Sequence, residues 1–384
     1  MFRLGGILVA ACVGLGCQAD LTARLLGDTA SFGMVAAELP SEPLQRFSYE
    51  RDLLGVRASV LLWATDRERA FAAADEAFDR ALRLQSLASA WEPDSELSRL
   101  NRALRVPGSH PVSADLAAIL DGARKRAERC YGAFDPTVGA LLEAQGYYAA
   151  DGEPRSPGRD ALAELAGIIG PDTWRLEPAP EAQAPPLLHF GAGLVWPGWR
   201  VAQHRVVTES PNVRFDLGAI LKGLAADAMA ESLRRRGLDR ALINLGSSTV
   251  LALEAPPGEA GWVYRIELAD TELEWSLCNR AVSVSEQLGQ PVFLDGRLAS
   301  HIVDPRTLKP VDHEVLKAVV QHRSAAAADA YSTAIVVLST SEAVGYLSDP
   351  GSRWMWNAWV EVLGESGTER RAFRIPEYLG VDYF

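Results

Sequence analysis

The sequence predicts an α+β fold, in which mixed sheets pack against helices within a single domain. Segments with strand-like and helix-like patterns follow one another in an irregular order, whereas a doubly wound α/β fold alternates them regularly. The 384 residues are 48% hydrophobic and 23% charged, which is ordinary for a globular protein with a large core. No internal repeat is visible, which argues against a solenoid. The domain is expected over residues 50–384.

Residues 1–17 have the pattern of a lipoprotein-type signal peptide. A positive residue precedes the uncharged run 4–16, which is too short to span a bilayer comfortably and fits a secretory signal. Gly16 followed by Cys17 resembles a bacterial lipoprotein cleavage site. We therefore expect an exported inner-membrane lipoprotein that faces the periplasm or extracytoplasmic side, anchored by a lipid on Cys17, with residues 18–49 as a linker. An ordinary cleaved signal is the alternative.

The net charge argues against one class of partner. The chain carries 50 acidic and 38 basic residues, a formal charge of -12, and such a surface repels phosphate backbones. We therefore expect no nucleic-acid partner, and a polyanionic ligand would need a cation, a lysine or backbone N–H groups beside it. Cys130 and Cys278 could form a disulfide, but two isolated cysteines give no disulfide framework.

The N-terminal half of the domain contains one predicted strand and two predicted helices. Residues 53–65 are rich in aliphatic side chains and predict a strand or hairpin arm. Apolar residues recur at helical spacing within 66–91, which predicts a long amphipathic helix. A second amphipathic helix is predicted within 111–136, with Ser113 as its N-cap and Gly132 as its C-terminal stop.

The C-terminal half contains a similar mixture of elements. A turn, a helix and a strand are expected over residues 215–246. Alternating apolar side chains predict strands over 262–270 and 280–285. A helix is expected to start near residue 326, and strands within 354–376 close the domain.

Asp329, Ser332 and Thr333 stand just ahead of the apolar run Ile335–Leu338. In a helix, Asp329 and Thr333 lie four residues apart and project from one face. A carboxylate and a hydroxyl on one face can bind a hard cation, which prefers oxygen ligands. Alternatively, Asp329 caps the start of the helix and Thr333 simply packs. Taken alone, this segment leaves both interpretations open.

Two other stretches also have a functional and a structural interpretation. The stretch FDLGAILKG (215–223) places an acid and a glycine at a helix entry, where backbone N–H groups attract phosphate and Lys222 adds a positive charge. The alternative is a capped amphipathic helix with an exposed Lys222. His301 either exchanges a proton with a ligand or holds the Asp304–Pro305 turn by a hydrogen bond.

Six stretches, in this order along the chain, resemble the ApbE family, the FAD:protein FMN transferases. They are WEPDSELSRLN (91–101), GAFDPTVGALL (132–142), FDLGAILKG (215–223), INLG (243–246), SHIVDPRT (300–307) and ADAYSTA (328–334). The resemblance covers about residues 50–345. It implies a flavoprotein enzyme with an ApbE-like, T-fold-related α+β fold and a single catalytic domain.

The resemblance implies a magnesium site. In the family, the counterparts of Asp329 and Thr333 bind Mg²⁺ through their side chains, and the counterpart of Ala219 binds it through its backbone carbonyl. Ser332 is adjacent and is included in this set. Oxygen ligands suit Mg²⁺, which usually completes its shell with substrate phosphate. With the resemblance counted, metal binding is favoured over capping for Asp329.

The resemblance also implies residues that bind FAD or transfer protons. The counterparts of Asp216 and Lys222 lie at the dinucleotide, and His301 and Asp304 are candidates for proton transfer. Trp91 stands where the family has an aromatic residue at the pocket, although a core position is the alternative. Further contacts to the dinucleotide are expected at Leu54, Ala133, Phe134, Asp135, Asn244, Gly246 and Ile302.

Several positions depart from the family pattern. Leu54-Gly55-Val56 stands where Met-Gly-Thr is usual. Ser247 and Leu308 each occupy a position that is usually glycine, and Ser247 adds a Cβ where backbone freedom is common. Glu286 adds a negative charge that could repel phosphate.

The function implied by the resemblance is Mg²⁺-dependent transfer of FMN from FAD to a Thr or Ser hydroxyl of an exported client protein, with release of AMP. Two alternatives remain open. One is an FAD pyrophosphatase that uses water as the acceptor and gives FMN and AMP. The other is a non-catalytic flavin-binding lipoprotein, which the departures from the family pattern would favour. The expected partners are FAD, the client protein and, through the lipid anchor, the membrane.

Overall fold

The computed structural model describes residues 43–148, 154–179, 204–269, 271–348, 357–364 and 370–374. All described helices and strands lie in one compact unit, Leu44–Phe384. The expected signal peptide and most of the expected linker lie outside the described residues. The first strand, β1 (Gln45–Leu53), begins inside the expected linker, so the folded unit starts earlier than residue 50.

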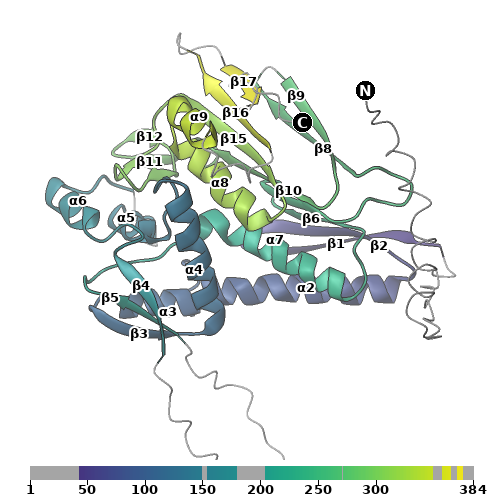
Figure 1. The fold of residues 1–384 in the computed structure, drawn as a ribbon, viewed down its shortest axis with the longest axis horizontal. Helices are drawn as coiled ribbons and strands as arrows, with labels where there is room; N and C mark the ends of the chain where they lie inside the picture. Colours follow the sequence, from purple (N-terminus) through teal and green to yellow (C-terminus); the bar gives the residue numbers. More distant parts are fainter. Residues whose placement is uncertain are drawn as a thin grey trace, which may run out of the picture. The chain divides into compact units, whose positions relative to one another are not determined.

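An eight-stranded sheet forms the centre of the unit (Figure 1). Its strand order is β1-β2-β6-β7-β10-β15-β16-β17, and every neighbouring pair is antiparallel. The remaining strands of this sheet are β2 (Val56–Ala64), β6 (Ala241–Leu245), β7 (Thr249–Ala252), β10 (Arg280–Glu286), β15 (Val315–His322), β16 (Asn357–Leu363) and β17 (Arg370–Arg374). The order places β7 beside β10, although a hairpin separates them in sequence.

Three helices pack together against this sheet: α2 (Arg67–Ala88), α7 (Gly218–Arg235) and α8 (Ala325–Val337). α2 confirms the long helix predicted within 66–91, and Asp66 caps it by accepting a hydrogen bond from the Arg69 amide. Its buried stripe is mostly alanine, which lets α7 approach closely. α7 confirms the helix predicted after Asp216 and ends at Gly237, whose φ is +67°.

α8 is buried along almost its whole length, as expected for a helix that is apolar on all sides. Its N-cap is Ser324, whose hydroxyl accepts a hydrogen bond from the Ala327 amide. Asp227 of α7 accepts further hydrogen bonds from Ser324 and from the Ala325 and Ala326 amides. The interpretation of Asp329 as the cap of this helix is therefore wrong. Among the described residues, no helix combines the length and the apolar composition needed to cross a membrane.

Smaller elements surround the main sheet. α4 (Ala114–Arg129) confirms the second predicted helix, with Ser113 as its N-cap and with Gly132 at φ +74° after its end. Cys130 is buried and Cys278 is half-buried, and both are free thiols. The other elements are α3 (Glu96–Ala103), η1 (Pro136–Val138), α5 (Gly139–Ala144), α6 (Arg159–Ala166), α9 (Thr340–Ser348), β3 (Gly108–Val112), β4 (Trp174–Pro178), β5 (His204–Thr208), β8 (Trp262–Leu268), β9 (Thr271–Leu277), β11 (Val292–Leu294), β12 (Arg297–Ala299), β13 (Val303–Asp304) and β14 (Lys309–Pro310).

Candidate functional site

The site is built where α7 crosses α8, and Gly223 allows the crossing. A Cβ at Gly223 would lie 2.3 Å from the Ala325 carbonyl oxygen and 2.5 Å from the Ala326 Cα. Both neighbours are backbone atoms, so glycine is required for this approach. The close contact lets the Gly223 N–H donate to Asp329 Oδ2 at 2.6 Å.

The Asp329 carboxylate is buried, with an exposed fraction of 5%, and both of its oxygens accept hydrogen bonds. Oδ1 accepts from Thr249 Oγ1 of β7 at 2.6 Å and from the Ser283 hydroxyl of β10. Burial raises the pKa of Asp329, while the nearby charge of Lys222 and the three hydrogen bonds oppose that rise. Two strands of the sheet and helix α7 therefore all donate hydrogen bonds to this one carboxylate of α8.

Three further hydroxyls lie on the same side of α8. Ser285 Oγ is 2.8 Å from Ser332 Oγ and 3.1 Å from Thr333 Oγ1. Ser332 Oγ also donates to the Asp329 carbonyl at 3.0 Å. The structure thus brings together Asp329, Ser332 and Thr333, which were predicted from the sequence.

The oxygen atoms of these side chains are suitable ligands for a hard cation. One carboxylate and several hydroxyls supply only oxygen atoms, which Mg²⁺ prefers over nitrogen and sulfur. The Gly223 N–H, which a regular helix would direct at the Ala219 carbonyl, donates to Asp329 Oδ2 at 2.6 Å. Within the described part of the chain, no group of three His, Cys, Asp or Glu side chains forms a metal site. Any cation here would depend on Asp329 for its negative charge.

Lys222 and His301 belong to the same neighbourhood. Burial, followed by the positive charge of Lys222, lowers the pKa of His301, and a hydrogen bond to the Gln290 backbone partly opposes this shift. Among the described residues, His301 Nδ1 is buried without a hydrogen-bond partner. Lys222 is half-buried, and its positive charge affects the pKa of both His301 and Asp329. The alternative of a capped helix with an exposed Lys222 therefore does not hold.

Replacing Lys222 by methionine should raise the pKa of His301, because a nearby cation disfavours the charged imidazolium. NMR titration of the histidine ring protons measures the shift, with His301→Gln used to assign the signal. Lys125→Met, which removes a lysine paired with Asp121 on α4, is the control. An unchanged His301 titration in Lys222→Met would contradict an effect of the Lys222 charge on His301.

The Asp304 carboxylate forms a structural ion pair with Arg306. Its Oδ1 accepts from the Arg306 amide at 2.8 Å and from Arg306 Nε at 2.9 Å, and its Oδ2 accepts from Arg306 Nη2 at 2.9 Å. A bidentate ion pair of this kind fixes the turn. The structure therefore gives no support to Asp304 as a proton acceptor, and Arg306 performs the turn-holding role considered for His301.

A second group of predicted residues lies at the start of α7. Asp216 Oδ1 accepts from the Gly218 amide at 2.7 Å, and Asp216 Oδ2 accepts from the Tyr148 hydroxyl at 2.6 Å. One of the backbone amides expected to attract phosphate therefore already donates a hydrogen bond to Asp216. Trp91 lies beside Tyr148 with 63% of its surface exposed, so the alternative of a core tryptophan is wrong.

Other predicted residues are buried in the core. Ala133 and Phe134 belong to the main hydrophobic cluster, and Asp135 caps η1 through the Thr137 amide. Burial raises the pKa of Asp135, whose Oδ2 has no partner among the described residues. Ile302 is also buried, and both its amide and its carbonyl are hydrogen-bonded. The structure does not bring these side chains to the cluster around Asp329.

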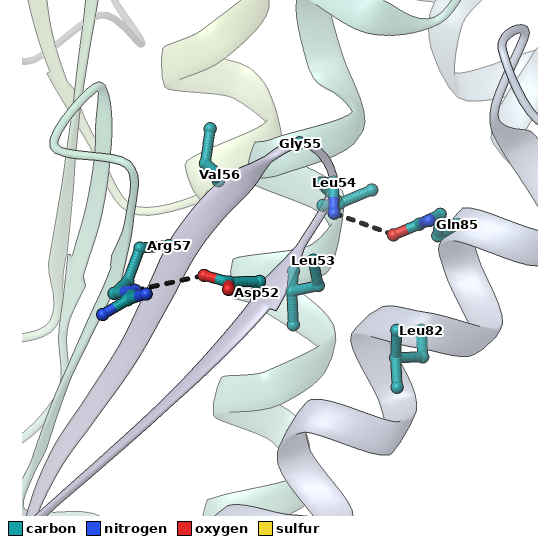
Figure 2. A pocket seen from close by; sticks show the side chains of 8 residues that line it. All are labelled: Asp52, Leu53, Leu54, Gly55, Val56, Arg57, Leu82 and Gln85. Atoms are coloured by element: carbon teal, nitrogen blue, oxygen red, sulfur yellow. Dashed lines mark hydrogen bonds and ion pairs between the residues drawn. The ribbon is translucent and has the colours of Figure 1, made fainter.

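A cavity of about 360 Å³ lies at the tip of the β1–β2 hairpin (Figure 2). Leu54, the one predicted site residue in its lining, donates from its backbone amide to Gln85 Oε1 at 2.7 Å. The tip also contacts the β6–β7 turn, because a Cβ at Gly246 would lie 2.8 Å from Val56. In that turn, Asn244 Oδ1 accepts from the Ser247 amide at 2.9 Å.

The departures from the family pattern have physical consequences. Ser247 and Leu308, both expected at positions where glycine is usual, adopt left-handed φ values of +61° and +59°. Such values are unfavourable for residues with a Cβ. Glu286 forms an ion pair with Lys317 at 2.9 Å, so a nearby lysine balances the negative charge that could repel phosphate.

Ser247→Gly is expected to raise the free energy of unfolding by about 0.5 kcal/mol. Removing the left-handed Cβ relieves roughly 1–2 kcal/mol, and the extra freedom of glycine in the unfolded chain offsets part of that gain. Urea unfolding measures the change. The control is Ser248→Gly, whose φ is not left-handed, and which should lower stability. A destabilised Ser247→Gly would contradict the strain.

Sequence reasoning missed Thr249 and Ser283, which hold Asp329, and Tyr148, which holds Asp216. A weak signal existed for Ser283, because a hydroxyl interrupts the apolar residues of a predicted strand. Thr249 and Tyr148 carried no comparable signal, since their partners are far away in the sequence.

Comparisons with known proteins agree with this fold. The ApbE family model matches residues 54–355. The FAD:protein FMN transferase of Rhodobacter capsulatus is 30% identical over 258 residues, which cover 65% of this chain but only 43% of that relative. The protein of the same name from Klebsiella pneumoniae is 25% identical over 287 residues, which cover 69% of this chain and 71% of the relative.

Solved structures extend the similarity to three dimensions. The apo form of Pseudomonas stutzeri flavinyl transferase ApbE superposes with a TM-score of 0.71 at 19% identity, and the match covers 90% of this chain and 100% of that one. ApbE from Thermotoga maritima gives a TM-score of 0.70 at 20% identity, with 87% and 98% covered. These likenesses confirm the predicted ApbE-like α+β fold.

Proposed function

The chain belongs to the ApbE family, and on that premise we propose that it transfers FMN from FAD to a hydroxyl of a protein acceptor. The observation that carries the proposal is the buried Asp329 carboxylate, which accepts hydrogen bonds from two hydroxyls and lies near the charge of Lys222, a lysine that also influences His301. The shared name of the relatives, FAD:protein FMN transferase, supports the same reaction.

The proposed cation site uses the side chains of Asp329 and Thr333 and the backbone carbonyl of Ala219, with Ser332 adjacent. A bound Mg²⁺ would neutralise the diphosphate of FAD and stabilise the charge that develops on it. Thr249, Ser283 and the Gly223 amide hold the carboxylate in one orientation. These contacts keep the site in place on both helices and two strands.

In the proposed reaction, a Thr or Ser hydroxyl of the acceptor forms a bond to the phosphorus of the FMN half. The bond between that phosphorus and the bridging oxygen of the diphosphate breaks, and AMP leaves with the bridging oxygen. Lys222 binds the phosphates through its charge. His301, whose pKa burial and Lys222 lower so that the neutral imidazole is favoured, accepts the hydroxyl proton.

Water as the acceptor would make the same site an FAD pyrophosphatase, and the cluster around Asp329 serves both reactions. A non-catalytic flavin-binding lipoprotein is less well supported, because Glu286 is paired with Lys317 and the hydroxyls of Ser332 and Thr333 lie together at Ser285.

The test combines the purified protein, FAD and Mg²⁺, with and without an exported acceptor domain that carries a Thr-containing flavinylation site. AMP release and protein-bound flavin are followed together. Flavin attached to the acceptor with equal AMP supports the transferase. AMP and free FMN without an acceptor indicate the pyrophosphatase, and neither product indicates binding alone.

We also propose that the chain is exported and anchored by a lipid on Cys17. The support is the sequence pattern of residues 1–17, which lie outside the described residues. Mass spectrometry of the mature N-terminus tests the proposal. An unmodified N-terminus after cleavage would show an ordinary secreted protein instead.

A further inference from the structure

Tyr148 makes three contacts, one through its hydroxyl and two through its ring. Its hydroxyl donates to Asp216 Oδ2 at 2.6 Å. The guanidinium carbon of Arg214 lies 4.2 Å from its ring centre, and the Trp91 ring meets it edge-on at 5.0 Å and 62°. The side chain is thus fixed on three sides.

The position of Arg214 explains why the Tyr148 ring has one orientation. Arg214 Nη1 pairs with Glu143 Oε1 at 3.0 Å, and the same carboxylate oxygen contacts Arg105 at 3.3 Å. Because Glu143 balances its charge, the planar guanidinium of Arg214 can stack on the face of the Tyr148 ring. Burial and the adjacent Asp216 raise the pKa of Tyr148 well above its usual value, so the phenol keeps its proton and its O–H donates a hydrogen bond to Asp216.

The position of Trp91 shows what this arrangement presents to a ligand. Trp91 is exposed over 63% of its surface, while its loop is held by hydrogen bonds from the Trp91 and Glu92 amides to Ser89 Oγ. An exposed indole on an ordered loop, inclined at 62° to a neighbouring tyrosine ring, offers a surface on which a planar ring can stack. The Asp216 carboxylate, held by the same tyrosine, lies at the start of α7.

We propose that Tyr148 is a positioning residue for FAD: its hydroxyl orients the Asp216 carboxylate, and its ring supports Trp91, so that the carboxylate and the indole face meet the dinucleotide together. This inference rests on the proposed function, because FAD is the planar ligand in question. Tyr148 acts through Asp216 and Trp91. Removing its hydroxyl therefore changes FAD affinity only while Asp216 remains available as its partner.

The test is a double-mutant cycle on FAD affinity, measured by quenching of flavin fluorescence. Tyr148→Phe keeps the ring and removes the hydroxyl, and it should weaken FAD binding about tenfold. In an Asp216→Ala background the same change should weaken binding less than about twofold, because the Tyr148 hydroxyl then has no acceptor to orient. Thermal melts without ligand should show that each variant is folded.

The neighbouring Tyr147 provides a matched control. Its hydroxyl is buried and has no hydrogen-bond partner among the described residues. Tyr147→Phe should therefore leave FAD affinity unchanged. Tyr148→Leu, which also removes the ring beside Trp91, should weaken binding more than Tyr148→Phe does.

Equal losses from Tyr148→Phe in both backgrounds, or no loss in either, would overturn the inference while leaving the proposed function intact. A large drop in the melting temperature of Tyr148→Phe would also overturn it, because the tyrosine would then be structural. If the wild-type protein does not bind FAD, the proposed function itself fails, and the inference fails with it.

Discussion

Asp329→Ala is expected to abolish Mg²⁺-dependent turnover of FAD, with a loss of at least about 100-fold. The substitution removes the carboxylate around which the oxygen donors gather. It also leaves the Gly223 amide and the Thr249 and Ser283 hydroxyls without their acceptor. Each buried donor left unsatisfied costs about 1–3 kcal/mol, so this variant should also melt earlier.

A more conservative substitution separates the two effects. Asp329→Asn keeps the shape and one acceptor oxygen but removes the charge. It should retain more stability than Asp329→Ala while still losing turnover. The measurement is the initial rate of AMP release against magnesium concentration, together with a thermal melt. Wild-type rates and wild-type magnesium dependence in Asp329→Asn would remove the cation site from the mechanism.

Asp227→Asn is the matched control for Asp329. Asp227 lies at the same helix crossing and accepts hydrogen bonds from Ser324 and the first amides of α8, but it contacts no hydroxyl of the site. We expect a lower melting temperature with turnover per folded molecule preserved. This pairing distinguishes loss of the site from general weakening of the α7–α8 contact.

Gly223→Ala is expected to destabilise the fold by about 1–3 kcal/mol, which is the usual range for overpacking a tight contact. The new Cβ would lie 2.3 Å from the Ala325 carbonyl oxygen and 2.4 Å from its carbonyl carbon, so two helix backbones must move apart. Denaturant unfolding measures the loss. Turnover should fall as well, since the movement withdraws the Gly223 amide from Asp329.

Gly345→Ala is the control for this substitution. Gly345 lies in α9, and a Cβ there would have no atom within 4 Å. Alanine is the better helix former by about 0.8–1.0 kcal/mol, so this variant should gain stability. If Gly223→Ala were as stable as the wild type, the close crossing of α7 and α8 would be refuted.

Local signals in the sequence account for much of the fold. Ser113 and Gly132, predicted as the N-cap and the C-terminal stop of one helix, mark its ends in the structure. These features depend on hydrogen bonds between residues a few positions apart. The helix α8 was predicted from its apolar run, and Asp329, considered there as an alternative cap, lies inside the helix, whose N-cap is Ser324.

The candidate site could be predicted only in part, because its contacts join distant segments. Asp329 and Thr333 were identified by spacing and by resemblance. The hydroxyls that hold Asp329 depend on the register of β7 and β10, which no local pattern specifies. Asp304 was a candidate for proton transfer because it lies in a motif of the family. In the structure its carboxylate is instead paired with Arg306, two residues further along the chain.

The sequence separation of the Asp329 contacts has a consequence for folding kinetics. Its partners lie 106, 80 and 46 residues away, at Gly223, Thr249 and Ser283. Contacts this distant require the closure of long loops, whose entropy must be lost before the contacts form. Individual helices can form much earlier than the ring of donors around the carboxylate. A partly folded chain therefore lacks the contacts that hold the Asp329 carboxylate. Turnover of FAD is expected only once these distant segments have folded together.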